Sequence, residues 1–215
     1  MLMQREREEI VEYCKKLVTS GLTKGTGGNI SICDRAQGLM AISPSGLDYF
    51  KTTPEDIVVM DFLNGGTVEG SRKPSVEFRM HAIFYARRGD VNAVVHTHAT
   101  ACSVMAALRW SLPAANYLIA VCGAAEIPCA EYATYATPEL AQAAFEAVGG
   151  GYAAFLANHG FISAAPDLPL AFGIAETCEH CAEIYLRAKA LGEPVLVPDD
   201  EVLKMAASLQ GYGRL

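Results

Sequence analysis

The chain has 215 residues, of which 51% are hydrophobic and 19% charged, and its formal net charge is −7 at pH 7. This length and composition exclude a disordered chain and predict one globular domain spanning residues 1–215. The acidic balance argues against general binding to nucleic acid or to an anionic membrane, while a local pocket for one phosphate stays compatible with it.

Cysteine usage and the N-terminal residues together predict a cytoplasmic protein. The seven cysteines are odd in number and lie mostly in apolar runs, which favours buried, reduced thiols. The first ten residues are charged and helical in pattern rather than secretory. No apolar run approaches the roughly 18 residues that a membrane-crossing helix needs. We therefore expect a cytoplasmic location and no membrane partner.

The first predicted elements are an amphipathic helix over residues 3–20 and a strand after residue 29, joined by Gly25-Thr26-Gly27-Gly28-Asn29. Three glycines in this segment let several backbone N–H groups point into one concavity, a nest that binds anions such as phosphate. Thr26 and Asn29 add side-chain donors. On pattern alone, a plain turn between helix and strand is the commoner explanation, and no Lys-Ser/Thr follows to make a Walker loop.

The next segment predicts strands at residues 39–42 and 57–61, and a hairpin at 64–66 leading into 67–69. The first of these strands runs into Ser43-Pro44-Ser45-Gly46, a second turn rich in hydroxyls and N–H groups. Pro74-Ser75-Val76-Glu77 opens a helix to about residue 88. Glu77 lies in its first turn, where capping and catalysis explain a carboxylate equally well. His81, one turn later, is interpreted as a structural or surface residue.

The strongest chemical signal is the run AVVHTHA at residues 93–99, in which an apolar strand ends in His96 and His98. Alternate residues of a strand point to the same face, so these two imidazoles share one face. His159 ends a second apolar strand, predicted at 153–157. Zinc prefers about four ligands in a tetrahedral array, and histidine is among its commonest. Satisfied core histidines are the alternative, but the combination favours a metal site.

The remaining pattern predicts helices at 100–110, 137–148 and 167–191, short strands or tight connections at 115–121 and 127–130, and a helix start near residue 198. The CxxC formed by Cys178 and Cys181 lies in the middle of the longest helix without a second CxxC, which favours packing thiols over a metal or redox site. Strands separated by helices predict a three-layer α/β/α fold with a central mixed, largely antiparallel sheet.

Five motifs in this order resemble the class II aldolase/adducin family, with the L-fuculose-1-phosphate aldolases as its most similar members. The similarity covers nearly the whole chain. The motifs that carry it are Gly25-Thr26-Gly27-Gly28-Asn29, Ser43-Pro44-Ser45-Gly46, Pro74-Ser75-Val76-Glu77, His96-Thr97-His98 and Asn158-His159-Gly160.

This resemblance implies a lyase that reversibly cleaves a ketose 1-phosphate, L-fuculose 1-phosphate or a close deoxy analogue, into dihydroxyacetone phosphate and an aldehyde such as L-lactaldehyde. One Zn²⁺ per subunit would be held by His96, His98 and His159, with Glu77 beside it as an ionised, catalytic carboxylate; other divalent ions also suit histidine ligands. The small-molecule substrate would be held by its phosphate, through Thr26, Gly28, Asn29, Ser45, Gly46 and Ser75.

The resemblance also implies a homotetramer with its active sites at subunit interfaces. Tyr117 matches a catalytic tyrosine that a neighbouring subunit contributes. Tyr135 matches an aromatic residue of the aldehyde pocket, and Tyr212 a tail tyrosine that closes over the site.

One departure from the family pattern leaves the exact substrate open. Val76 replaces a second serine that reaches the phosphate, which removes one donor worth about 1 kcal/mol. A 5-deoxyribulose- or methylthioribulose-1-phosphate aldolase, and a methylthioribulose-1-phosphate dehydratase on the same metal site, are the alternatives. The related 4-epimerases carry aspartate in place of Glu77. A non-catalytic, adducin-like scaffold is expected to lack the three histidines that this chain keeps.

Overall fold

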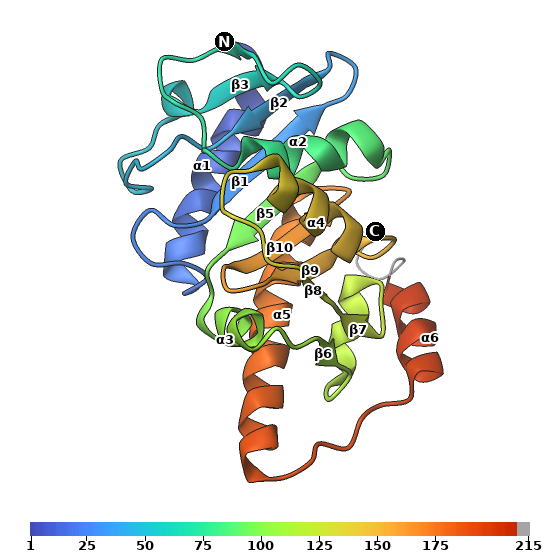
Figure 1. The fold of residues 1–215 in the computed structure, drawn as a ribbon. Helices are drawn as coiled ribbons and strands as arrows, with labels where there is room; N and C mark the ends of the chain where they lie inside the picture. Colours follow the sequence, from blue (N-terminus) through green and yellow to red (C-terminus); the bar gives the residue numbers. More distant parts are fainter. Residues whose placement is uncertain (210–215) are drawn as a thin grey trace.

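An eight-stranded sheet runs through the centre of the molecule in the order β4-β3-β2-β1-β5-β10-β9-β8 (Figure 1). In the computed structural model, residues 1–209 are described. Only β8 and β9 pair in parallel within this part of the chain, so the predicted mixed, largely antiparallel sheet is confirmed. The strands are β1 Asn29–Asp34, β2 Leu39–Ile42, β3 Val58–Asp61, β4 Thr67–Glu69, β5 Ala93–Thr97, β8 Cys129–Ala130, β9 Ala153–Leu156 and β10 Gly160–Ala165.

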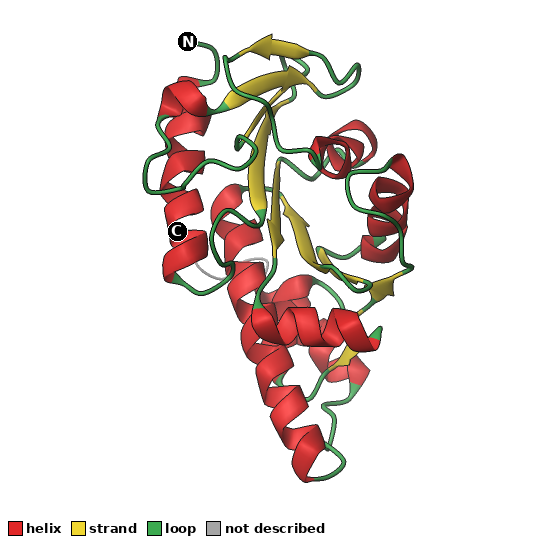
Figure 2. Cartoon of the chain, turned by 60° about the vertical axis from the view of Figure 1, so that its left-hand side comes forward, coloured by secondary structure: helices red, strands yellow, loops and turns green. Residues whose placement is uncertain are grey.

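Helices cover both faces of this sheet, which makes three layers (Figure 2). One face carries α1 (Gln4–Thr19), α3 (Thr100–Leu108) and α5 (Leu168–Leu191). The other face carries α2 (Phe78–Arg87) and α4 (Pro138–Val148). At one end, α6 (Asp199–Leu209) packs on the short 3-10 helix η2 (Tyr117–Cys122), beside the two-stranded sheet of β6 (Leu112–Pro113) and β7 (Glu126–Ile127). A further 3-10 turn, η1, spans Pro54–Asp56.

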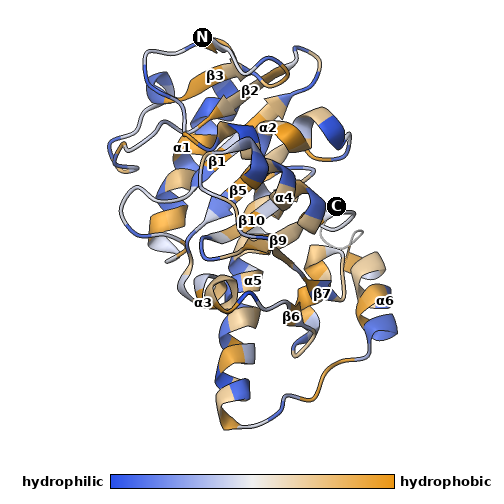
Figure 3. Cartoon of the chain, viewed as in Figure 1, coloured by the Kyte–Doolittle hydropathy of each residue, from blue (hydrophilic) through white to orange (hydrophobic). Residues whose placement is uncertain are grey.

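The central strands are buried on both faces, and their side chains alternate between two hydrophobic cores. On β5, Ala93 and Val95 pack beneath α1 and α5, whereas Val94 packs beneath α2. Figure 3 shows the corresponding hydropathy, with hydrophobic strands inside and hydrophilic segments on the outer sides of the helices. A rigid, doubly covered sheet of this kind fixes the positions of residues at its strand ends.

Two predicted elements differ from the structure. The helix after Pro74 begins only at Phe78, because Pro74 forms an isolated bridge with Pro44 and the Ser75 N–H donates to the Ser43 carbonyl. The stretch predicted as a strand or tight connection at 115–121 contains the 3-10 helix η2, whose start is capped by Asn116 Oδ1 accepting from the Leu118 N–H. In both places local hydrogen bonds outweigh the residue pattern.

The CxxC residues pack inside the core, as the sequence predicts. Cys178 and Cys181 lie on the buried side of α5, whereas His180 is exposed. The Cys178 Sγ lies 3.1 Å from the Cys122 Sγ. Glu179, between the two CxxC cysteines, accepts from the backbone N–H groups of Ala101 and Cys102, both at 2.8 Å. A carboxylate from α5 thus caps the N-terminus of α3, the helix that follows the HxH strand.

Replacing Glu179 with alanine is expected to lower the free energy of unfolding by about 1–2 kcal/mol, because two N–H groups at the start of α3 lose their acceptor. Urea denaturation followed by circular dichroism measures this loss. Glu183→Ala is the matched control, since Glu183 lies one turn later on α5 and forms a surface ion pair with Arg187. Equal losses in the two variants would show that the cap contributes nothing.

Among residues 1–209, no helix is long and apolar enough to cross a membrane. The predicted C-terminal tail, with Tyr212, lies outside the described residues.

Candidate metal centre and active site

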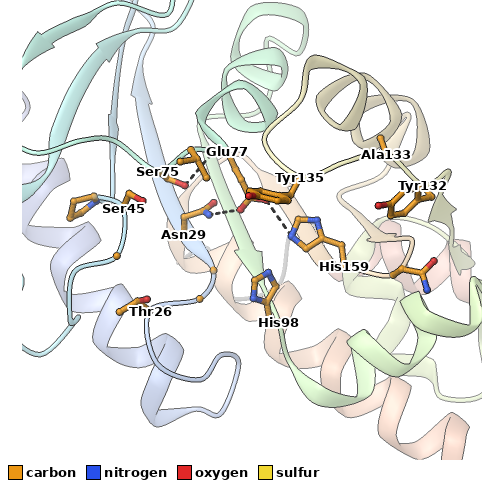
Figure 4. Close-up of a pocket in the computed structure, with 16 residues that line it drawn as sticks. Thr26, Asn29, Ser45, Ser75, Glu77, His98, Tyr132, Ala133, Tyr135 and His159 are labelled. Carbon is orange, nitrogen blue, oxygen red and sulfur yellow. Dashed lines mark hydrogen bonds and ion pairs between the residues drawn. The ribbon is translucent and has the colours of Figure 1, made fainter.

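Three imidazoles converge at the ends of the central strands, and Figure 4 shows two of them, His98 and His159, beside Glu77. His96 lies on β5, His98 just after it, and His159 in the turn between β9 and β10. One ring nitrogen from each lies within 4.8 Å of the others, and the Nε2 atoms of His96 and His98 are 2.9 Å apart. The structure therefore brings together the three histidines that the sequence selects.

Backbone contacts explain why the three rings meet. The buried Nδ1–H of His96 donates to the Phe161 carbonyl at 2.9 Å, which leaves the Nε2 lone pair directed at the other rings. The His98 N–H donates to the Leu22 carbonyl as the chain leaves the sheet. Asn158 adopts a left-handed conformation, with φ of 55°, and so turns the chain sharply just before His159.

Glu77 completes the cluster from the N-terminus of α2. Its Oε2 lies 3.4 Å from the His96 Nε2 and its Oε1 lies 3.2 Å from the His159 Nε2. Oε2 also accepts from the Asn29 Nδ2 at 2.9 Å, whereas the buried Oε1 has no hydrogen-bond partner among the described residues. A buried carboxylate oxygen in this state is suited to a cation.

The electrostatics favour neutral imidazoles with free lone pairs. Burial, reinforced by the neighbouring His98 and His159, holds the pKa of His96 well below its ordinary value. Burial and then His159 also lower the pKa of His98. Three imidazole nitrogen atoms with an adjacent carboxylate are the donor set of a divalent metal site, so these residues fit such an ion.

A cleft of about 390 Å³ opens beside the cluster. The predicted phosphate-binding residues all line it, and they come from the two hydroxyl- and glycine-rich turns and the start of α2: Thr26, Gly28, Asn29, Ser45, Gly46 and Ser75. Gly28 has φ of 72°, and a Cβ there would lie 2.6 Å from the His96 carbonyl oxygen. The buried Tyr49 hydroxyl holds this turn by donating to the Gly28 carbonyl at 2.6 Å.

The rim of the cleft contains residues that the sequence analysis assigned and others that it missed. Tyr135 and Val76 line it and are exposed, as is Tyr132, which the sequence analysis did not select. Asn158, next to His159, also lines the cleft and was likewise missed. Tyr117 lies on η2, is 56% exposed and does not line the cleft of its own chain.

Comparisons with known proteins identify the family of the chain. Residues 8–186 match the family described as Class II Aldolase and Adducin N-terminal domain. The chain is 53% identical to the 5-deoxy-D-ribulose 1-phosphate aldolase of Bacillus thuringiensis serovar kurstaki, over 100% of both chains. It is 39% identical to a 5-methylthioribulose-1-phosphate/5-deoxyribulose-1-phosphate aldolase of Rhodospirillum rubrum, over 96% of this chain and 92% of that one.

A solved structure of an L-fuculose 1-phosphate aldolase superposes with a TM-score of 0.94 at 50% identity, covering 98% of each chain. The three-layer fold, the histidine cluster and the relatives of equal length are thus all consistent with one family. The chain belongs to the class II aldolase and adducin family, and it is an enzyme of the aldolase type, a carbon–carbon lyase.

Proposed function

We propose that the protein is a zinc-dependent aldolase that reversibly cleaves a ketose 1-phosphate into dihydroxyacetone phosphate and an aldehyde. The observation that carries this proposal is the position of the histidine cluster and Glu77 beside a cleft that is also lined by two glycine- and hydroxyl-rich turns. A phosphorylated ketose would place its phosphate in those turns and its carbonyl beside the metal ligands.

The turns would hold the substrate by a group remote from the bond that breaks. Backbone N–H groups around Gly28 and Gly46 and the hydroxyl of Ser75 face the same cleft. A phosphate fixed there orients the rest of the sugar, so that binding energy from a non-reacting group serves the chemical step. Val76, at the rim, offers no donor, which leaves the two turns to hold the phosphate.

The residues near the histidines would move the protons. His96, His98 and His159 would hold the zinc, which supplies Lewis acidity for the charge that develops at the ketone when the C3–C4 bond breaks. Glu77 would return a proton to C3 in the cleavage direction and remove it in the synthetic direction. Tyr117 of a neighbouring subunit would take the proton of the C4 hydroxyl, and Tyr135 would line the aldehyde pocket.

Among ketose phosphates, 5-deoxyribulose 1-phosphate is the first candidate. The relative that is 53% identical over the full length carries this name. The rim formed by Tyr132 and Tyr135 offers aromatic surface, which suits the methyl end of a deoxy sugar. Cleavage would leave dihydroxyacetone phosphate and acetaldehyde. L-Fuculose 1-phosphate is the second candidate, because the solved structure that is 50% identical bears that name.

A substrate panel tests this proposal. Zinc-loaded protein is incubated with 5-deoxyribulose, methylthioribulose and L-fuculose 1-phosphates, and dihydroxyacetone phosphate and aldehyde are measured by mass spectrometry. We expect both products in equal amounts from the first, and none after removal of the metal with a chelator. Loss of water from an intact carbon chain would show a dehydratase instead, and no product from any substrate would refute the aldolase proposal.

The proposal includes a homotetramer in the cytoplasm. The exposed Tyr117 lies on η2 outside the cleft of its own chain, as expected for a residue that serves the site of a neighbouring subunit. Buried thiols, such as Cys102 and Cys178, suit a reducing compartment.

A further inference from the structure

A stripe of polar residues on α2 leads from Glu77 into the buried interior. Glu77, His81 and Tyr85 are spaced four residues apart, so they lie on one side of the helix, one turn above another. This side packs on the face of β1 that carries Asn29 and Ser31, which are themselves two residues apart. His81, Tyr85 and Ser31 are almost completely buried. In this buried setting the Ser31 hydroxyl lies within hydrogen-bond distance of both the His81 ring and the Tyr85 hydroxyl.

Four hydrogen bonds join these residues into one chain. The Tyr85 hydroxyl lies 2.6 Å from the Ser31 Oγ, which lies 2.7 Å from the His81 Nδ1. The His81 Nε2 contacts the Asn29 Oδ1, and the Asn29 Nδ2 donates to the Glu77 Oε2 at 2.9 Å. The His81 imidazole thus bridges Ser31 and Asn29 of β1, and Asn29 in turn contacts the Glu77 carboxylate.

The charge state of His81 fixes the direction of this chain. Burial, then the neighbouring His96, lowers the pKa of His81 to about 3, so the ring is neutral and has one N–H and one lone pair. Nε2–H donates to the Asn29 Oδ1, and Nδ1 accepts from the Ser31 hydroxyl. Since the carbonyl of the Asn29 amide is held by His81, its NH₂ group must face Glu77.

The opposite orientation of the amide would be unfavourable. It would place the Asn29 carbonyl oxygen against the Glu77 carboxylate, so that two acceptors would face each other in a buried site, even with the His81 ring in the other tautomer to accept from the NH₂ group. In the observed orientation every O–H and N–H of the chain points toward Glu77. The last of these donors, the Asn29 NH₂ group, fixes the direction in which the second carboxylate oxygen, Oε1, faces the His159 ring.

We propose that His81 is a positioning residue for the aldol reaction, acting through the Asn29 amide to hold the Glu77 carboxylate in the orientation in which it moves the proton. The inference rests on the proposed function, because it assumes that Glu77 carries out that step. His81 contacts neither the metal cluster nor the cleft, so its effect is expected on turnover rather than on substrate binding.

Substitutions of His81 that differ in side-chain length and in hydrogen-bond donors test this role. His81→Gln keeps an amide N–H near the position of Nε2 and is expected to keep most of kcat. His81→Asn is too short to reach Asn29, and His81→Leu has no donor; both are expected to lower kcat about 10–100-fold, the usual effect of losing a residue that orients an active-site group. KM and zinc content, measured by steady-state kinetics and elemental analysis, are expected to stay close to wild type.

A double substitution separates positioning from a general structural role. In the Glu77→Gln background, His81→Asn is expected to cause no further loss of kcat, because the carboxylate that it orients is already absent. Tyr85→Phe is the control for the remote end of the chain. It is expected to change kcat by less than about two-fold, since the Ser31 hydroxyl still donates to His81 when the tyrosine hydroxyl is removed.

The outcomes separate the two proposals. Equal kcat in His81→Gln and His81→Asn, or a full additional loss from His81→Asn in the Glu77→Gln background, would overturn the positioning role while leaving the aldolase function intact. The Gln and Asn variants decide the question even where His81→Leu does not fold. A wild-type enzyme without activity on any ketose phosphate would refute both proposals.

Discussion

Replacing His98 with alanine is expected to abolish zinc retention and aldolase activity together. The His98 Nε2 lies 2.9 Å from the His96 Nε2 at the centre of the cluster, so its loss leaves two imidazoles and one carboxylate. A tetrahedral site that loses a ligand to a methyl group cannot recover it from the surrounding apolar strand ends. Zinc per subunit after gel filtration and release of dihydroxyacetone phosphate measure the two effects.

The control for His98→Ala is His180→Ala, because His180 is exposed on α5 and far from the cluster in the sequence. This variant is expected to keep both zinc and turnover. Full zinc occupancy in His98→Ala protein would contradict the assignment of this residue as a ligand. Normal turnover without zinc would contradict the metal-dependent mechanism.

Glu77→Gln is expected to lower kcat by about two orders of magnitude or more while zinc stays bound, because the amide keeps the shape of the side chain but cannot take up the proton. The three histidines remain in place to hold the ion. Steady-state kinetics give kcat, and elemental analysis gives the zinc content. A solvent-exposed carboxylate, Glu183, provides the control as Glu183→Gln.

Two results would contradict this role for Glu77. A fully active Glu77→Gln enzyme would show that another group moves the proton at C3. Loss of zinc with loss of activity would show that the carboxylate serves chiefly as a metal ligand. Its oxygens lie 3.2 Å from the His159 Nε2 and 3.4 Å from the His96 Nε2, which is close enough for that role.

Local signals predicted most elements of the fold. Thr137 and Asp167 mark the starts of α4 and α5, with proline at the first helical position of α4 and at the second of α5, and both side chains accept the N–H that a cap should accept. The strand at Leu39–Ile42 was predicted at its observed bounds. The order of strands could not be predicted from single elements, because pairing between β1, β5 and β10 depends on contacts between residues far apart in the chain.

The site was predictable where residue types are rare and chemically specific. Two histidines on one strand and a third after another sufficed to locate the metal cluster. Tyr132 and Asn158 were missed, since nothing in the residues around them distinguishes a cleft lining from an ordinary loop. The sequence analysis interpreted His81 as a structural or surface residue without relating it to the polar residues four positions away on either side. The spacing of Glu77, His81 and Tyr85 is the signal that places it on the buried side of α2.

The cluster also has a thermodynamic consequence, since its histidines come from the end of β5 and from the β9–β10 turn, and the adjacent Glu77 from the start of α2. These segments meet only when the central sheet is complete, so an unfolded chain offers an ion at most the adjacent pair, His96 and His98. Binding therefore draws the equilibrium toward the native state, by about 2.7 kcal/mol when free metal is at 100 times its dissociation constant. The catalytic ion would therefore also stabilise the folded arrangement of the segments that bind it.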